Sequence, residues 1–202
     1  MNMDAPTRIQ ARNRRLILDA ALQVFSQEGY RGATLDRIAQ AAGLSKPNLL
    51  YYFESKEAVH RTLLTEVLET WIAPLRGLDP GGEPTAEILG YVRRKLEMSQ
   101  AYPRESRLFA NEILQGAPHV EGFIRGELKR LVDDRAAVIR GWAAQGRIAP
   151  VDPYHLIFSI WALTQHYADF EAQIRMIRGP GCDPLAGAAE HLQQHFTRLL
   201  AP

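Results

Sequence analysis

The chain has 202 residues, 46% of them hydrophobic and 23% charged, with 24 lysines and arginines against 23 aspartates and glutamates. This composition excludes a disordered chain, and the lone Cys182 excludes an intramolecular disulfide framework or a multi-cysteine zinc site. No segment approaches the roughly 18 apolar residues of a membrane span, and no apolar run follows the N-terminal charges, so we expect a cytoplasmic protein that does not enter the membrane.

Apolar residues recur at three- and four-residue spacing from end to end, which predicts an all-α fold of about nine helices. The first helix is expected from about residue 9 to residue 28, ended by Gly29. Thr34 is a suitable cap for a short second helix that stops at Gly43, and Ser45 for a short third helix. The N-terminal part of the chain therefore reads as three helices joined by tight turns.

A longer fourth helix is expected to begin at Ser55 and to run toward Leu78, where a segment rich in proline and glycine, 79–84, interrupts the pattern. Further helices are expected at about 85–101, 103–115, 118–145, 152–177 and 185–200. The sequence predicts two domains: a helix-turn-helix DNA-binding domain over 1–55, and a ligand-binding and dimerisation bundle over 56–202.

Residues 34–53 have the spacing of a helix-turn-helix, with two short helices around a tight turn. The third helix has side chains suited to a DNA major groove, because lysine and asparagine bond base edges and an apolar side chain contacts a thymine methyl. Its outward face shows Lys46, Pro47, Asn48, Leu50, Tyr51 and Tyr52. The alternative is that any all-α protein offers short helix pairs, and that the tyrosines only pack in a core.

The charge distribution favours the DNA-binding interpretation. Residues 1–60 hold 8 basic and 6 acidic side chains, whereas residues 61–202 hold 16 and 17. Four arginines, Arg8, Arg12, Arg14 and Arg15, cluster ahead of the first helix, as in an arm that contacts phosphates. A solvated run of charge explains these arginines equally well.

The same residues carry a family resemblance. The segments 24–30 (VFSQEGY), 34–39 (TLDRIA) and 43–57 (GLSKPNLLYYFESKE) resemble the TetR family of bacterial transcriptional regulators. The resemblance implies a homodimer with two heads that read a palindromic double-stranded operator and a C-terminal bundle that binds a small-molecule inducer.

By the family pattern, the third helix, which begins after Ser45, supplies both base-reading and phosphate-holding residues. The implied base-reading positions are Lys46, Pro47, Asn48 and Leu50, and the implied phosphate-holding positions are Thr34, Tyr51, Tyr52 and Lys56. The sequence departs from the usual pattern with Pro47 in place of glycine, Leu50 in place of tyrosine and Tyr52 in place of histidine. These departures leave the operator sequence open.

The resemblance continues into the C-terminal region. The segments 71–75, 102–109, 115–118 and 161–170 are similar to members of the family that regulate pyrimidine utilisation. This implies a repressor that leaves DNA when uracil or thymine binds, with no cofactor. Paralogues with other ligands can keep these segments, so a different small metabolite stays an alternative.

One predicted helix carries side chains suited to a planar ligand. Trp161, Gln165 and Asp169 fall four residues apart on one face, which gives an aromatic surface beside an amide and a carboxylate. Trp71 is expected to add a second apolar wall, and Arg107 a donor to a carbonyl. The alternative is structural: two core tryptophans, a buried pair of Arg107 with Asp169, and a bond from Gln165 to backbone.

Other chemistry is weakly supported, and we do not expect an enzyme. His191 and His195 have the spacing of a metal pair, but Leu192 stands where a metalloprotease needs glutamate. A helical ligand-binding or enzymatic bundle with an incidental head is the rival interpretation, and it predicts no salt-sensitive binding to promoter DNA.

For the dimer, apolar side chains of the last two helices are expected to pair: Ile157, Ile160, Leu192, Phe196 and Leu199.

Overall fold

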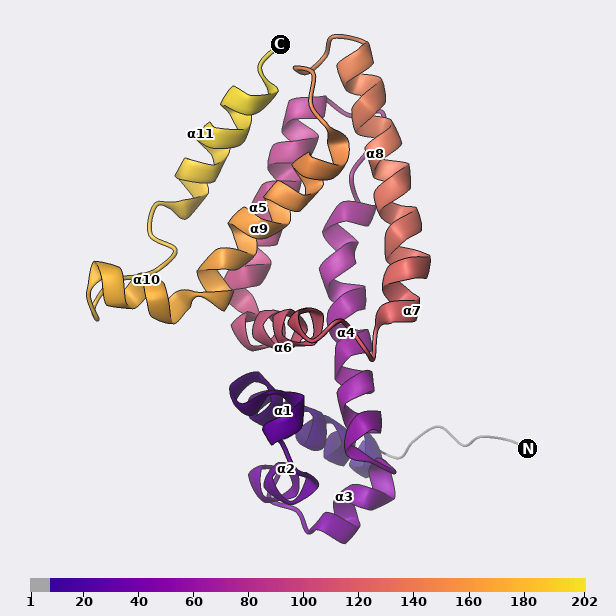
Figure 1. The fold of residues 1–202 in the computed structure, drawn as a ribbon. Coiled ribbons are helices and arrows are strands. Elements are labelled where there is room, and N and C mark those ends of the chain that lie inside the picture. Colours follow the sequence, from indigo (N-terminus) through magenta and orange to yellow (C-terminus); the bar gives the residue numbers. More distant parts are fainter. Residues whose placement is uncertain (1–7) are drawn as a thin grey trace. The chain divides into compact units, whose positions relative to one another are not determined.

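The computed structural model describes residues 8–202, and all regular secondary structure in this range is helical, as the sequence predicts. The elements follow in the order shown in Figure 1: α1 (Arg8–Gly32), α2 (Leu35–Ala41), α3 (Lys46–Tyr52), α4 (Lys56–Arg76), α5 (Pro84–Ala101), α6 (Pro103–Leu114), α7 (Glu121–Phe123), the π-helical η1 (Ile124–Leu128), α8 (Lys129–Ala144), α9 (Pro153–Asp169), α10 (Glu171–Arg178) and α11 (Ala188–Leu200). Within 8–202, no helix combines the length and the apolar character needed to cross a bilayer.

The chain divides into two compact units. The N-terminal unit contains the chain up to Val67 together with Arg107–Val120. The bundle unit contains Leu68–Ser106 and Glu121–Pro202. Helices α4 and α6 each contribute residues to both units, because the divisions fall inside them.

Side-chain caps define the short helices of the N-terminal unit. Thr34 Oγ1 accepts a hydrogen bond of 3.2 Å from the backbone N–H of Arg37 at the start of α2. Ser45 Oγ accepts one of 3.3 Å from the N–H of Asn48 at the start of α3. Such caps satisfy N–H groups that have no partner within the helix. Both predicted caps are therefore confirmed.

Two glycines break the helical backbone at the positions that the sequence predicts, Gly29 inside α1 and Gly43 after α2. Gly29 has φ 67°, which interrupts the regular part of α1, and Gly43 has φ 68° in the turn between α2 and α3. The left-handed region is strained for residues with a Cβ atom. Phe25, Ile38 and Leu49 are fully buried among these helices, so each short helix is held by an apolar anchor.

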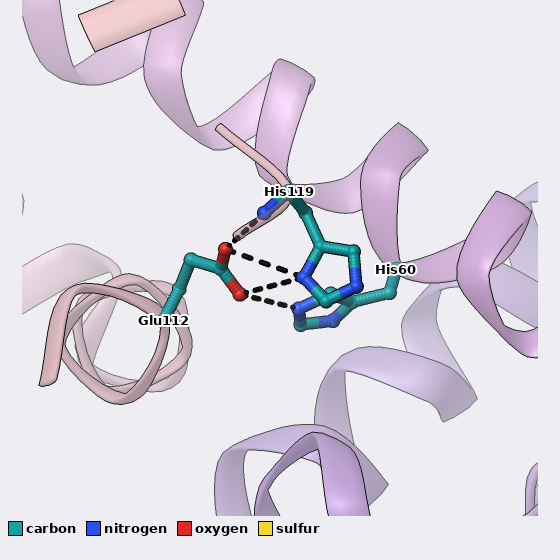
Figure 2. Close-up of side chains that lie close together, drawn as sticks. All are labelled: His60, Glu112 and His119. Carbon is teal, nitrogen blue, oxygen red and sulfur yellow. Dashed lines mark hydrogen bonds and ion pairs between the residues drawn. The ribbon is translucent and has the colours of Figure 1, made fainter. Parts of the chain in front are cut away.

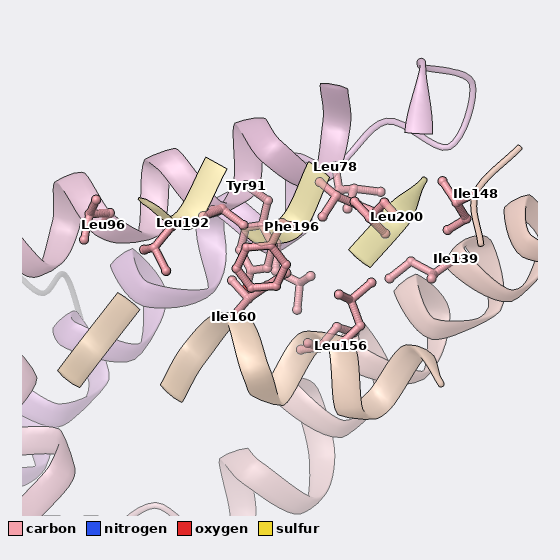
Figure 3. Packing of buried hydrophobic residues seen from close by; sticks show 14 of the residues in the cluster. Leu78, Tyr91, Leu96, Ile139, Ile148, Leu156, Ile160, Leu192, Phe196 and Leu200 are labelled. Carbon is pink, nitrogen blue, oxygen red and sulfur yellow. The ribbon is translucent and has the colours of Figure 1, made fainter. Parts of the chain in front are cut away.

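The core of the bundle unit forms where α5 packs against α9 and α11, and where α8 packs against α9. Figure 3 shows the apolar side chains that meet there, among them Tyr91, Ile160, Leu192 and Phe196. All four are at most 2% exposed. Burial of this apolar surface is the main source of stability for such a bundle, at about 25 cal/mol per Å².

Two predicted helices are interrupted in the structure. The helix expected over 118–145 begins at Glu121 and contains the π-helical stretch η1, and the one expected over 152–177 breaks at Phe170. Phe170 has φ −112° and ψ 26°, outside the helical region. Apolar spacing continues through both interruptions, so periodicity alone does not reveal them.

The residues predicted to pair two copies of the chain are largely internal. Ile157, Ile160, Leu192 and Phe196 are at most 1% exposed and belong to the core of the bundle unit, whereas Leu199 is 41% exposed. The prediction was wrong for the first four because an amphipathic helix buries its apolar stripe against its own unit first.

We predict that Phe196→Ala lowers the free energy of unfolding by about 3–5 kcal/mol, because it leaves a cavity in the core. Thr197→Ala at an exposed position of the same helix is the matched control, and its effect should be within about 0.5 kcal/mol, as for most surface changes. Urea denaturation at one protein concentration measures both. Similar losses for the two variants would contradict the described core.

Candidate DNA interface and effector site

Helix α3 presents most of its side chains to solvent. Leu49 is its one buried residue, whereas Lys46, Pro47 and Asn48 are exposed. Leu50 is 40% exposed and Tyr51 is 71% exposed, although both are large and partly apolar. The residues predicted to read bases therefore lie together on an accessible surface, and the buried Leu49 packs the opposite face of α3 against its unit.

The ammonium of Lys46 is held near that surface by an ion pair. Its Nζ lies 2.9 Å from Asp36 Oδ2 of α2, and both side chains are exposed. An exposed ion pair contributes only about 0–1 kcal/mol. Lys46 can therefore exchange Asp36 for a guanine or a phosphate at little cost.

The two tyrosines at the end of α3 are oriented by α1. Gln10 Nε2 donates a hydrogen bond of 3.2 Å to the Tyr51 hydroxyl, and Asn13 Nδ2 donates one of 2.9 Å to the Tyr52 hydroxyl. In both bonds the tyrosine oxygen is the acceptor, which leaves its O–H free to donate. This arrangement suits hydroxyls that donate to phosphate oxygens.

Lys56 has a structural task at the start of α4. Its Nζ donates to the backbone carbonyls of Tyr30, at 2.8 Å, and Ala33, at 2.9 Å. It also lies 4.4 Å from the centre of the Tyr30 ring. These contacts fix the segment between α1 and α2 against α4, which positions Thr34 at the head of α2.

The four arginines predicted as an arm ahead of the first helix lie inside α1. Arg14 stacks on the Phe53 ring at 4.3 Å and donates to the Tyr52 carbonyl at 3.4 Å. Arg15 pairs with Asp19 at 3.1 Å and with Glu66 at 3.4 Å. Arg14 and Arg15 thus have partners inside the N-terminal unit, and DNA contact by the cluster stays a prediction.

A second group of polar side chains lies in the bundle unit around Trp71. Trp71 is 7% exposed, and the Nζ of Lys95 lies 4.8 Å from the centre of its ring. Lys95 is 2% exposed. Burial lowers the pKa of Lys95 to about 7, although the charge of Asp169 opposes the shift. A lysine with this pKa is half-charged near neutrality.

Hydrogen bonds organise the neighbouring side chains. The indole N–H of Trp161 donates to the Tyr91 hydroxyl at 2.6 Å, and the Ser106 hydroxyl donates to Asp169 Oδ1 at 2.5 Å. Burial raises the pKa of the Tyr91 hydroxyl, which stays protonated. The aromatic and carboxylate groups are thus oriented before any ligand binds.

Three of the residues predicted for a pocket belong to this group. Trp71 and Asp169 both interact with Lys95, and Trp161 bonds to Tyr91. Gln165 is half-buried on α9, between Trp161 and Asp169 in the sequence. Arg107 lies in the N-terminal unit.

The indole N–H of Trp71 is buried without a hydrogen-bond partner in the described chain, so the group retains an unused donor.

Sequence reasoning missed Tyr91, Lys95 and Ser106. Lys95 stands in a charged run, 93–97 (RRKLE), which is typical of an exposed helix face. The available signal was helical phase, because Lys95 follows the buried Tyr91 and Val92 by four and three residues.

Comparison with known proteins identifies the family. The model for the C-terminal region of YcdC-like proteins matches residues 64–200, and the model for bacterial regulatory proteins of the tetR family matches residues 17–61. The chain belongs to the TetR family. It is 49% identical over 173 residues to the HTH-type transcriptional regulator RutR of Escherichia coli K12, which covers 86% of this chain and 82% of that protein.

Other TetR-like proteins share the fold at lower identity. The ketosteroid transcriptional regulator KstR2 of Mycobacterium tuberculosis has a TM-score of 0.76 at 20% identity, covering 94% of this chain and 95% of that one. AibR in complex with isovaleryl coenzyme A and operator DNA has a TM-score of 0.71 at 18% identity, covering 94% and 99%. The protein is thus a TetR-family transcriptional regulator closely related to RutR, and not an enzyme.

Members of the TetR family bind operator DNA and small effectors. We predict that Lys46→Ala weakens operator binding and that Asn48→Ala reduces discrimination between bases, by about 1–3 kcal/mol for a bidentate contact. Fluorescence anisotropy on operator and random DNA at several salt concentrations measures both. If Asn48→Ala loses the same affinity for operator and for random DNA, Asn48 is a phosphate contact. If Lys46→Ala binds the operator with unchanged affinity, Lys46 does not belong to the interface.

The buried lysine has a pH-dependent consequence. The folded chain releases the Lys95 proton near pH 7, whereas the unfolded chain keeps it until about 10.5, so wild-type stability rises with pH through this window. We predict that Lys95→Met has its largest gain in free energy of unfolding below pH 7, and that the gain declines toward pH 10. Urea denaturation across this range tests it, and a difference independent of pH would contradict a buried ammonium.

Proposed function

We propose that the protein is a homodimeric repressor of pyrimidine-utilisation genes that leaves its operator when uracil or thymine binds in the bundle unit. The observation that carries this proposal is the group formed by the buried Trp71 and Lys95 with the half-buried Asp169. It combines an aromatic ring, a cation and an acceptor in one part of the bundle unit. The likeness to RutR and the C-terminal segments shared with regulators of pyrimidine utilisation support the same ligand class.

The chemistry of this group matches a pyrimidine-dione. Uracil is planar and carries two carbonyls and two N–H groups, so it needs a stacking surface, donors and an acceptor. Trp161 offers the surface, Lys95 and the unused Trp71 N–H offer donors, and the Asp169 carboxylate offers an acceptor. Gln165 supplies an amide with both functions.

The N-terminal unit is proposed to read DNA through α3. Lys46, Asn48 and Leu50 would approach base edges, while Tyr51 and Tyr52 hold phosphates. Thr34, Ser45 and Pro47 complete the surface at the starts of α2 and α3, and Lys56 acts there by fixing the preceding segment. In a homodimer, two such helices enter successive major grooves about 34 Å apart on a palindromic operator.

Effector binding would act through α4, which contributes Trp71 to the bundle unit and Lys56 to the N-terminal unit. A ligand that favours one position of this helix changes the separation of the two heads. A coupling free energy of about 1–3 kcal/mol changes operator occupancy by one to two orders of magnitude. A modest difference in effector affinity between the two positions of α4 would therefore suffice for release.

We predict that Asp169→Asn and Gln165→Ala abolish the response to uracil while DNA binding persists. Asp169→Asn keeps the shape of the side chain but removes the carboxylate. A thermal shift with uracil, thymine, purines and unrelated aromatics detects binding, because a ligand specific for the folded state raises the melting temperature. Anisotropy on operator DNA then measures release.

Asp134→Asn on the exposed face of α8 is the matched control, and it should respond as the wild type does. Variants of Asp169 or Gln165 that still release DNA at the wild-type uracil concentration would contradict the proposed site. A purine or another aromatic that alone raises the melting temperature would keep the regulator but replace its ligand.

A further inference from the structure

A separate cluster of two histidines and a glutamate lies within the N-terminal unit. His60 comes from α4, Glu112 from α6, and His119 from the segment that follows α6. Figure 2 shows the two imidazole rings facing the carboxylate from different elements. The side chains of His60 and Glu112 are each 2% exposed, and that of His119 is 14% exposed. Neither the DNA-reading surface nor the effector group uses these residues.

The donor atoms lie at distances close to those of a coordination sphere. His60 Nε2 is 3.2 Å from Glu112 Oε2, and His119 Nδ1 is 3.0 Å from the same oxygen. One donor atom from each residue lies within 4.8 Å of the other two. In a tetrahedral zinc site with bonds of about 2.0–2.1 Å, ligand atoms are about 3.3 Å apart. A zinc ion therefore requires only small side-chain movements.

The charge of the cluster also favours a cation. Across residues 8–202, the ion-pair partners found for Glu112 are these two histidines. Buried carboxylates are normally paired with a cation or bound to a metal.

The backbone around His119 is shaped to complete the cluster. Its N–H donates to Glu112 Oε1 at 2.7 Å, which fixes the carboxylate. The turn that leads there contains Ala117 with φ 59°, the one non-glycine residue with positive φ in the described chain, and its N–H bonds the Glu112 carbonyl at 2.9 Å. Strained backbone of this kind persists where the surrounding structure enforces it, often at binding sites.

Aromatic rings enclose the two imidazoles. The His60 ring lies 4.7 Å from Phe25 and 4.8 Å from Tyr30, and the His119 ring lies 4.6 Å from Tyr30, measured between ring centres. Such a shell limits water and holds the rings in orientation, which strengthens metal binding. His119 is the more exposed histidine, so its side of the cluster is where a water could fill a fourth position.

We propose that His60, Glu112 and His119 form a zinc-binding site in the N-terminal unit. Two imidazole nitrogens and one carboxylate oxygen are a donor set that Zn²⁺ uses with water as the fourth ligand. Bound zinc ties α4, α6 and the segment after α6 together within the unit that contains the DNA-reading helix. The metal would therefore stabilise this unit independently of the effector in the bundle.

Zinc binding can be measured on the untagged full-length protein after treatment with a chelator. The protein is equilibrated with zinc chloride, desalted and assayed for bound metal, and its melting temperature is recorded with zinc and with magnesium. We expect one zinc per chain and a higher melting temperature with zinc but not with magnesium. No retained zinc in the wild type would overturn the proposal.

Variants separate this site from accidental binding. Glu112→Gln keeps the shape of the side chain and should lose the zinc, and His119→Asn at the more exposed position provides a second variant should the first not fold. The double variant H191N/H195N removes the other histidine pair, on α11, and should bind zinc as the wild type does. Zinc retained by folded Glu112→Gln or His119→Asn, or lost from H191N/H195N, would overturn the proposal.

Discussion

The constraint on which the structure depends is the cost of burying an ionised group in a helical interior, which amounts to several kcal/mol for each ion. The bundle unit buries Lys95 beside Trp71, and the N-terminal unit buries Glu112 between two histidines. A leucine at position 95 would satisfy the same packing without that cost. These are the two places where we propose ligands, a planar effector in the bundle unit and a cation in the N-terminal unit.

In the proposed DNA-reading surface, by contrast, polar and charged side chains stay exposed to solvent. Helix α3 has seven residues and one buried side chain, Leu49, so packing alone holds it weakly. The cap at Ser45 and the hydrogen bonds from α1 to Tyr51 and Tyr52 compensate. These local bonds fix α3 and its two tyrosines while the side chains proposed to read bases stay exposed, which would reduce the ordering cost of DNA binding.

Features set by neighbouring residues could be predicted from the sequence. The caps at Thr34 and Ser45 and the turn at Gly43 depend on bonds within a few positions, and the structure has them. The break at Phe170 could not be predicted, since apolar spacing continues through it. Lys95 and the cluster of His60, Glu112 and His119 were missed because their significance depends on burial and on interactions between residues up to 74 positions apart in the chain, which spacing does not show.

The central claim is that Lys95 donates a hydrogen bond to a carbonyl of the bound effector. It is tested most directly by calorimetry of uracil binding in buffers of different ionisation enthalpy, which reports the protons taken up. Lys95 has a pKa of about 7 in the free protein, and a hydrogen bond to a carbonyl favours its charged form. The account predicts proton uptake at about pH 8, little at about pH 6, and none at either pH for Lys95→Met. Binding without proton uptake at about pH 8 would contradict it.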